Sequence, residues 1–437
     1  MEYPYLIIGI FIITYVFISL RRVSKVKIER PAIALLGGIA MIFAGAISTS
    51  DALSAVDLNT IALLLGMMLI VSALELSGFF NFAAVRVSRF AKTQFQLLVF
   101  LVVLTALLSA LFLNDAVVLM LTPVVLKVTK ILKVDPVPYL VGEAMASNIG
   151  SVATPIGNPQ NAYIAMKSSI PFVSFVVYLL PLTILCVLLE IVVLKLVFRK
   201  ELAKPMCRLR RVDVDKIHFF KAEKRFHLIS IVKLFEGSEI KNRKLLVFSM
   251  IVFGFVFTGF IISSPSFPIS IIAIAGGAFI FALVQPVCGV HSKDVLKGVD
   301  WGILVFFAGL FILLRGVENT ILMTTIENYF TQHPNIFNLS FATAVLSNLV
   351  SNVPAVMLLA PASHAMADSN AFYLTLAAIS TLAGNATLLG AAANIIVAES
   401  ALRYGFELKF KDFLIAGLPT TVLTIIAATL YLYIFFH

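Results

Sequence analysis

Four short clusters of polar residues, mostly neutral and in part mixed with glycine and proline, interrupt the long apolar runs of this chain. They are Asn114–Asp115, Asn148–Asn161, Ser351–Asn352 and Ser380–Asn394. Glycine and proline break helices and expose backbone groups, while Asn, Ser and Thr add neutral donors and acceptors. Such groups can replace the water around a small ion or solute without holding it permanently. This chemistry is typical of a transport site.

The residues predicted to bind the transported species lie in these clusters. They are Asn114, Asp115, Ser147, Asn148, Thr154, Gly157, Asn158, Asn161, Ser351, Asn352, Thr387, Gly390 and Asn394. The alternative for the glycines and prolines is that they only allow helices to pack closely, as small residues do in membranes.

Two acidic residues are predicted to serve coupling. A charge at the centre of a membrane helix costs about 2.5–3.5 kcal/mol on insertion scales, so each one suggests a role. Asp115 is a possible proton carrier or cation ligand, and Glu143 lies one helical turn before Ser147. No catalytic residue, metal site or cofactor is predicted beyond Na⁺ or H⁺ as the coupling ion. Transient Na⁺ binding is predicted at Asn114, Asn148 and Asn352.

The elements that must position these residues are membrane helices. Of the 437 residues, 60% are hydrophobic and only 13% are charged, which excludes an ordinary soluble domain. Apolar runs of about 20 residues recur, each long enough to cross about 30 Å of hydrocarbon. Backbone in lipid must satisfy its own hydrogen bonds, so runs of this length predict helices. The sequence therefore predicts an all-α polytopic membrane protein.

The two halves of the chain resemble each other in three ordered blocks. Leu53–Glu75 aligns on Leu296–Glu318, Asn114–Pro123 on Asn352–Pro361, and Ser147–Asn161 on Ser380–Asn394. Inverted repeats are common in secondary transporters, whose site lies where discontinuous helices meet near the membrane midplane. We therefore predict an inverted-repeat transporter with about 10 transmembrane helices, two of them broken, plus two re-entrant hairpins. The hairpins are expected because 93–133 and 336–365 are polar at their centres.

The predicted organisation follows from these blocks and from the basic residues. It comprises N-terminal scaffold helices (1–52), a first repeat (53–198) with a hairpin (93–133) and a broken helix (136–168), a basic loop (199–244), scaffold helices (245–295), and a second repeat (296–437) with a hairpin (336–365) and a broken helix (371–397).

Charge distribution predicts the orientation. Of the formal net charge of +10, an excess of +8 falls between Arg199 and Lys244, beside a membrane helix. Such a loop favours contact with anionic lipid on the cytoplasmic side. It lacks the aromatic pattern of a nucleic-acid-binding module, so no nucleic-acid partner is predicted. The expected location is the cell (inner) membrane, with both termini outside and the 199–244 loop in the cytoplasm.

The motifs resemble those of the ion transporter superfamily that includes arsenite permeases, NhaD-type antiporters and divalent-anion/sodium symporters. The resemblance rests on Asn114–Pro123, Ser147–Asn161 and Ser351–Leu358, and is closest to bacterial arsenical-pump-like anion permeases. It implies a homodimer, with a scaffold domain and a moving transport domain in an elevator-type cycle. The symporter branch carries Ser-Asn-Thr at each tip, which neither hairpin here has.

The predicted function is ion-gradient-coupled transport of a small anion or oxyacid such as arsenite. No nucleotide-binding P-loop is present, so the alternative energy source is a separate ATPase subunit. The alternative function is Na⁺/H⁺ antiport with Asp115 as the titrating carrier. A remote alternative is an intramembrane enzyme, but the six histidines lie in predicted loops or at segment ends, so the chain is expected not to be an enzyme.

Overall fold

The computed structural model describes residues 4–20, 28–206, 240–264, 266–365 and 368–436. Within these ranges the chain is helical, apart from one isolated bridge between Ser264 and Phe267. The predicted all-α class is therefore confirmed. Most of the basic loop 199–244 lies outside the described residues.

The helices of the first half are α1 (Pro4–Leu20), α2 (Arg30–Phe43), α3 (Thr49–Ala55), α4 (Leu58–Ser77), α5 (Phe79–Ser88), α6 (Gln94–Leu111), α7 (Asn114–Leu132), α8 (Val137–Ser151), α9 (Pro159–Ser168), α10 (Phe172–Val197) and α11 (Arg199–Leu202). Those of the second half are α13 (Arg243–Ile261), α14 (Ile269–Cys288), α15 (Ser292–Lys297), α16 (Trp301–Val317), α17 (Ile321–Gln332), α18 (Ile336–Val350), α19 (Asn352–Leu359), the 3₁₀ turn η2 (Ala360–Ala365), α20 (Ser369–Ala383), α21 (Ala392–Arg403) and α22 (Phe410–Phe436).

Several helices are long and apolar enough to cross a bilayer. Among the described residues these are α4, α6, α10, α13, α14 and α22, and a seventh span arises if α16 and α17, which meet at 86°, count as one. Four further apolar helices, in α1, α2, α18 and α20, are shorter. The count of about 10 spans stays a prediction, because it counts each broken helix as one crossing.

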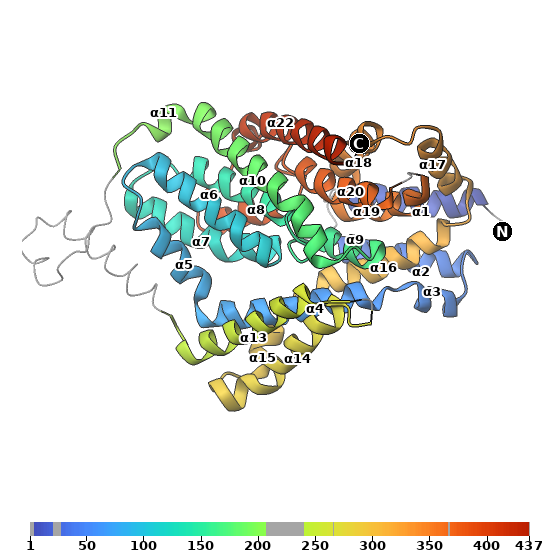
Figure 1. The fold of residues 1–437 in the computed structure, drawn as a ribbon, viewed down its shortest axis with the longest axis horizontal. Helices are drawn as coiled ribbons and strands as arrows, with labels where there is room; N and C mark the ends of the chain where they lie inside the picture. The colour runs from blue at the N-terminus through green and yellow to red at the C-terminus, as the bar shows by residue number, and fades with distance from the viewer. Residues whose placement is uncertain (1–3, 21–27, 207–239, 265, 366–367, 437) are drawn as a thin grey trace, which may run out of the picture.

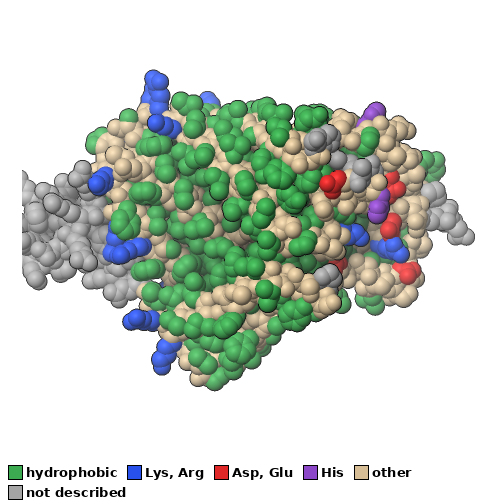
Figure 2. Space-filling model, in the orientation of Figure 1, with side chains coloured by type: hydrophobic (Ala, Val, Ile, Leu, Met, Phe, Trp, Pro, Cys, Tyr) green, Lys and Arg blue, Asp and Glu red, His purple; other side chains and the backbone are tan. Residues whose placement is uncertain are grey.

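The surface is divided along the long axis of the molecule. Figure 2 shows hydrophobic side chains over the middle of one face and most of the visible Lys and Arg at one end. Asp, Glu and His lie mostly at the other end, together with some Lys or Arg. An apolar surface between two charged ends suits a protein that lies across a membrane.

Two helix pairs place the halves of the molecule against each other. Helix α4 packs on α14, and α16 packs on α2. Gly66 of α4 lies against the backbone of Ala273 and Gly309 of α16 lies against that of Ala34, so closely that a methyl group at either glycine would overlap these atoms. Gly66 and Gly309 are aligned residues of the predicted repeat. The inverted sense of the two copies stays a prediction.

Candidate functional site

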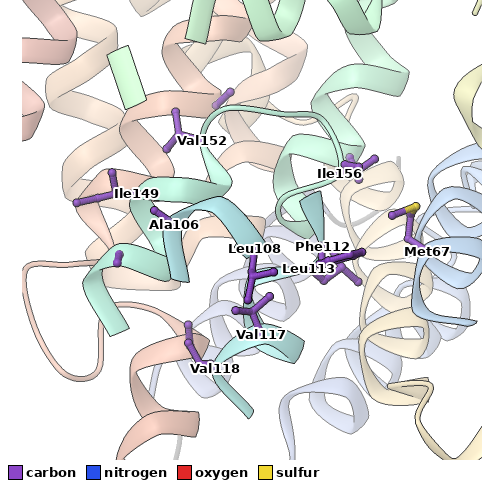
Figure 3. Close-up of a cluster of buried hydrophobic side chains, with 14 of the residues drawn as sticks. Met67, Ala106, Leu108, Phe112, Leu113, Val117, Val118, Ile149, Val152 and Ile156 are labelled. Carbon is purple, nitrogen blue, oxygen red and sulfur yellow. The ribbon is translucent and has the colours of Figure 1, made fainter. Parts of the chain in front are cut away.

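Helices α6 and α7 form an antiparallel pair, hairpin 1, whose tip is 112–115. The tip is held by the loop that separates α8 from α9. The Asn114 N–H donates to the Gly157 carbonyl at 2.9 Å, and Thr154 Oγ1 donates to the Ala110 carbonyl at 2.6 Å. Figure 3 shows Phe112 and Leu113 among buried apolar side chains that include Ile156 of this loop. The start of α7 is therefore fixed against the break.

The break between α8 and α9 is built by asparagine side chains. Asn158 caps α9 by accepting the Asn161 N–H at 2.8 Å, and its amide donates to Ser151 Oγ at 2.8 Å. The Asn161 amide donates to the carbonyls of Ser151 and Thr154 at 3.1 and 3.2 Å. These side chains satisfy the carbonyls that the end of α8 leaves open, which irregular backbone at membrane depth requires.

Helices α18 and α19 form the second pair, hairpin 2, with Ser351 at its tip. Ser351 has φ +80°, a left-handed conformation that is uncommon outside glycine. Hairpin 2 contacts α20 through Ser347 Oγ, which donates to the Ser380 carbonyl at 3.1 Å, and through the Asn348 amide, which donates to the Ala383 carbonyl at 3.1 Å. Figure 1 places α6 and α7 toward one end of the molecule and α18 and α19 toward the other.

The break between α20 and α21 repeats the chemistry of the first break. The Asn394 amide donates to the carbonyls of Gly384 and Thr387 at 2.9 and 3.0 Å, as the aligned Asn161 does in the first half. Gly390 lies against the Gly384 carbonyl, where a methyl group would overlap it. Thr387 and Gly390 therefore shape the break, as Thr154 and Gly157 do.

A chain of buried amides joins hairpin 1 to both broken helices. The Asn114 amide donates to Asn148 Oδ1 at 3.1 Å, and the Asn148 amide donates to Asn385 Oδ1 at 2.7 Å and to Asn394 Oδ1 at 3.0 Å. Gln160 also reaches across, donating to Thr381 Oγ1 at 3.0 Å. Asn148 therefore links hairpin 1 to the second half of the chain, and Gln160 provides a further hydrogen bond between the two halves.

The two hairpin tips and both breaks line one pocket of about 310 Å³. Five of the residues predicted from the sequence line it, namely Asn114, Asp115, Asn148, Ser351 and Asn352. The structure therefore brings the two tips together from hairpins at opposite ends of the molecule. The other predicted residues are buried or lie behind this lining: Thr154, Gly157, Asn158, Asn161, Thr387, Gly390 and Asn394 build the breaks, and Ser147 Oγ donates to the Ala144 carbonyl.

Six helices begin at this pocket. The lining includes the first residues of α2, α7, α9, α19 and α21, which are Arg30, Asn114, Pro159, Asn352 and Ala392, and also Gly302, the second residue of α16. A helix N-terminus carries roughly half a positive charge and points N–H groups outward. Six of them around one cavity create a positive potential that favours an anion or the oxygens of an oxyacid.

Charged side chains modify this potential. Asp300 and Glu29 line the pocket from exposed positions, and Asp300 Oδ1 accepts the Ile303 N–H at 3.2 Å, so it caps α16. Asp115 and Arg30 are half-buried and also line the pocket. Arg30 is the one basic residue in the lining, within the described chain.

Two amide oxygens at the tips have no hydrogen-bond partner in the described chain. Asn114 Oδ1 and Asn352 Oδ1 are buried and unsatisfied, although both residues line the pocket. A buried acceptor without a donor is costly, so a hydroxyl hydrogen of a bound oxyacid or a Na⁺ ion would stabilise each one. These residues fit the predicted transient Na⁺ sites.

Glu143 lies behind the pocket on α8. It is fully buried, its Oε1 accepts the Thr122 hydroxyl at 2.9 Å, and its Oε2 has no partner in the described chain. It does not line the pocket, so the structure separates Glu143 from Asp115.

Four residues of this site were not predicted. Arg30 lies in the range predicted as N-terminal scaffold helices, and Gln160, Thr381 and Asn385 lie within the predicted broken helices but are not among the predicted site residues. The second-half break is rich in polar residues, which was a usable signal for Thr381 and Asn385. Nothing in the repeat alignment points to Arg30, because it precedes the aligned blocks.

Comparisons with known proteins identify similar sequences over the whole chain. A family model described as citrate transporter matches residues 15–374. An uncharacterized transporter of Mycobacterium tuberculosis is 29% identical over 98% of this chain and 97% of its own length. The silicon efflux transporter LSI3 of Oryza sativa is 31% identical over 95% of this chain and 94% of its own length. A putative arsB transporter of Dictyostelium discoideum is 26% identical over 97% and 91%.

One solved structure has a similar fold. The YdaH transporter of Alcanivorax borkumensis matches with a TM-score of 0.53 and 16% sequence identity, covering 99% of this chain and 98% of that chain. At this sequence identity the match is evidence for a shared fold alone.

Proposed function

This chain belongs to the citrate transporter family, and from that premise we propose that it is a secondary active transporter for a small anion or oxyacid. The family is one of membrane transporters within the predicted ion transporter superfamily, which supports a multi-pass transporter and is consistent with a protein that is not an enzyme. The substrate, the coupling ion and the mechanism are our proposals.

The observation that carries the proposal is the convergence of six helix N-termini on one pocket between the two hairpin tips. The summed helix dipoles favour negative oxygens, and amide groups of Asn114, Asn148 and Asn352 supply neutral hydrogen bonds. A pocket of about 310 Å³ suits a small solute rather than a large one. Relatives named for silicon efflux and arsB-type transport support an oxyacid or anion of this size.

Transport in proteoliposomes tests this function. Purified protein is expected to accelerate uptake of at least one of citrate, arsenite and silicic acid over protein-free liposomes. Asn148→Ala is expected to abolish that uptake, because it removes the amide that joins four segments of the site. Uptake no faster than in protein-free liposomes for every solute would contradict the proposal.

Na⁺/H⁺ antiport is the second proposed function, favoured by the unsatisfied oxygens of Asn114 and Asn352 in the pocket. Carbonyl-type oxygens are the ligands that a hard cation prefers. In everted vesicles, proton release on addition of Na⁺ that is lost in Asp115→Asn would favour this function. No release with wild-type protein would exclude it.

The mechanism that we propose is elevator-type alternating access. Its support is the paired contacts of α4 with α14 and of α16 with α2, which hold these helices rigidly, while the hairpins and broken helices surround the pocket. We propose that the first group is the scaffold, that it forms the homodimer, and that the second group moves. Crosslinking of cysteine pairs placed across the two groups tests the movement, and mass photometry tests the dimer.

The orientation is proposed from charge. Most of the visible Lys and Arg gather at one end of the molecule, which we assign to the cytoplasm by the positive-inside rule (Figure 2). The N- and C-termini are then outside the inner membrane, as the sequence predicts. Fusing a reporter that folds only in the cytoplasm to the C-terminus tests this assignment, and an active fusion would contradict it.

A further inference from the structure

We propose that the Arg30 guanidinium binds a singly charged anion in the pocket, and that Asp115 takes the place of that anion when the pocket is empty, so that the anion and a proton bind together. The inference rests on the proposed transport function and extends it to the charge of the substrate and the identity of the coupling ion.

Arg30 lies between the two hairpin tips although it belongs to neither. It is the first residue of α2, and its Nη1 donates to Ser351 Oγ of hairpin 2 at 3.4 Å, a long and weak hydrogen bond. Asp115 lies in the first turn of α7 in hairpin 1, lines the same pocket, and its charge acts on Arg30. A guanidinium has five N–H donors, so the contact with Ser351 leaves several for an anion.

The charged groups around this pair are few. Glu29 and Asp300 stand at exposed positions of the lining, where water screens them. The lining residues from α8, α9, α19 and α21 carry no charge within the described chain, and Glu143 of α8 lies behind the lining. Among the residues that the structure describes, Arg30 and Asp115 are therefore the charged groups that a bound anion would meet at depth.

This arrangement makes an anion and the Asp115 carboxylate competitors for Arg30. When Asp115 is ionised it neutralises the guanidinium and repels an anion. When a proton from solution forms the O–H bond on Asp115, the guanidinium is left for the anion, and the charge at Arg30 is balanced as before. A singly charged anion replaces the single negative charge of the Asp115 carboxylate. A multiply charged anion would also be repelled more strongly by Glu29 and Asp300.

Uptake by proteoliposomes that contain a pH-sensitive dye, clamped at zero membrane potential, tests the exchange. The probes are inorganic phosphate at mildly acidic pH, where the singly charged form dominates, citrate, and silicic acid as a neutral solute. Wild-type protein is expected to take up phosphate with internal acidification and more slowly as the pH rises. With the lumen buffered at an acidic pH, where phosphate stays singly charged, Asp115→Asn is expected to take it up without acidification, at a rate that follows only the external concentration of the singly charged form.

Phosphate uptake by Arg30 variants is the second part of the test. Arg30→Gln is expected to lose about 10- to 100-fold in phosphate uptake, the range for one charge-assisted hydrogen bond, while Arg30→Lys keeps part of it. The matched control is Lys297→Gln, which removes an exposed positive charge from α15 without touching the pocket and is expected to behave like wild type.

Different outcomes would contradict the role of Arg30 and the transport function itself. Uptake by wild type that is equally fast in Arg30→Gln would overturn the role of Arg30 and leave the transport function intact. Uptake of silicic acid alone, unaffected by Arg30→Gln, would overturn the anion and retain a transporter of neutral oxyacids. Failure of wild type with every probe, and with arsenite as well, would overturn the transport function itself.

Infrared difference spectroscopy gives a readout that a structural role would not produce. Adding phosphate to wild-type protein in liposomes is expected to create a protonated-carboxyl band that is absent in Asp115→Asn. A spectrum without this band in wild type would overturn the exchange, even if Arg30→Gln is inactive because it folds poorly.

Discussion

Hairpin 1 and hairpin 2 end at the same pocket, but different parts of the chain hold their tips. Hairpin 1 is fixed to its own broken helix by backbone-level contacts, where Gly150 of α8 lies against Ala106 of α6 and the Asn114 N–H bonds to Gly157. Its Phe112 also packs on Phe253 of α13, with ring centroids 4.9 Å apart. These contacts are apolar or backbone-mediated, and none of them involves a charged side chain.

Hairpin 2 depends on the N-terminal helices. The Tyr15 hydroxyl of α1 donates to the Pro354 carbonyl at 3.1 Å, the Ser19 hydroxyl donates to the Leu349 carbonyl, and Arg30 contacts Ser351. The two tips are aligned in sequence, but different contacts hold them in place. Hairpin 2 packs mainly on α20, and individual hydrogen bonds join it to α1 and α2, whereas hairpin 1 contacts α8, the first break and α13.

The largest expected effect comes from removing the residue that joins hairpin 1 to the second broken helix. Asn148→Ala leaves Asn114 without its acceptor and Asn385 and Asn394 without their donor, all three buried. Each unsatisfied group costs about 1–3 kcal/mol, so the variant is expected to lose several kcal/mol of stability and all transport. Thermal unfolding in detergent measures the first. The control Asn348→Ala removes an exposed amide of hairpin 2 and should lose far less; equal losses would contradict the role of Asn148.

A methyl group in the contact surface of hairpin 1 should have the next largest effect. Gly150→Ala overlaps the backbone of Ala106, and overpacking of this kind costs about 1–3 kcal/mol. Gly384→Ala near hairpin 2 should cost less, because the new Cβ would lie 3.0 Å from Ala391 Cβ and 3.2 Å from the Asn352 amide. Gly254→Ala, with no atom within 4 Å, is the control. A larger loss at Gly384 than at Gly150 would reverse the comparison.

A substitution that weakens the contacts of hairpin 2 alone tests whether the two hairpins are held independently. Tyr15→Phe removes one buried hydrogen bond, worth about 1 kcal/mol, so amide hydrogen exchange at residues 351–358 is expected to become about five-fold faster. Residues 110–117 of hairpin 1 serve as the internal control and should exchange at the wild-type rate. Faster exchange in both hairpins would show that they are held together and not separately.

The smallest expected effect concerns a difference between the two broken helices. Glu143 aligns with the buried Leu376, so Glu143→Leu gives α8 the residue that α20 has. Thr122 keeps its bond to the Val118 carbonyl at 2.7 Å, and replacing a buried ionisable group by an apolar one is often neutral, so stability should change by about 1 kcal/mol or less. The pH dependence of uptake should also remain. Its loss would assign the coupling proton to Glu143 instead of Asp115.

The sequence predicts where the hairpin tips and helix breaks lie better than it predicts what each polar residue does there. The polar clusters located both tips and both breaks, because glycine, proline and asparagine stop helices by local rules that operate in any context. Asn114, Asn148 and Asn352 line one pocket as expected. Thr154, Asn158 and Asn161 are predicted to bind the transported species. The structure instead shows the two asparagines bonding to Ser151 beside the break, and Thr154 bonding to the Ala110 carbonyl of hairpin 1.

Arg30 and the α16–α17 bend show where local rules fail. Arg30 follows several basic residues, so its composition indicates a loop, and only the packing of α2 on α16 brings it to the pocket. The 86° angle between α16 and α17 likewise depends on tertiary contacts, because Glu318–Thr320 contain no proline or glycine. Asp115 was found from sequence because its motif lies within the repeat.

The left-handed backbone of Ser351 has a consequence for how readily the second tip changes shape. A non-glycine residue in this region carries about 1–3 kcal/mol of conformational strain. Any alternative tip in which Ser351 returns to negative φ recovers that free energy, which equals at least one hydrogen bond and shifts populations about ten-fold. The observed shape therefore persists only while its neighbours outweigh the strain, and each contact they lose makes the relaxed shape more populated.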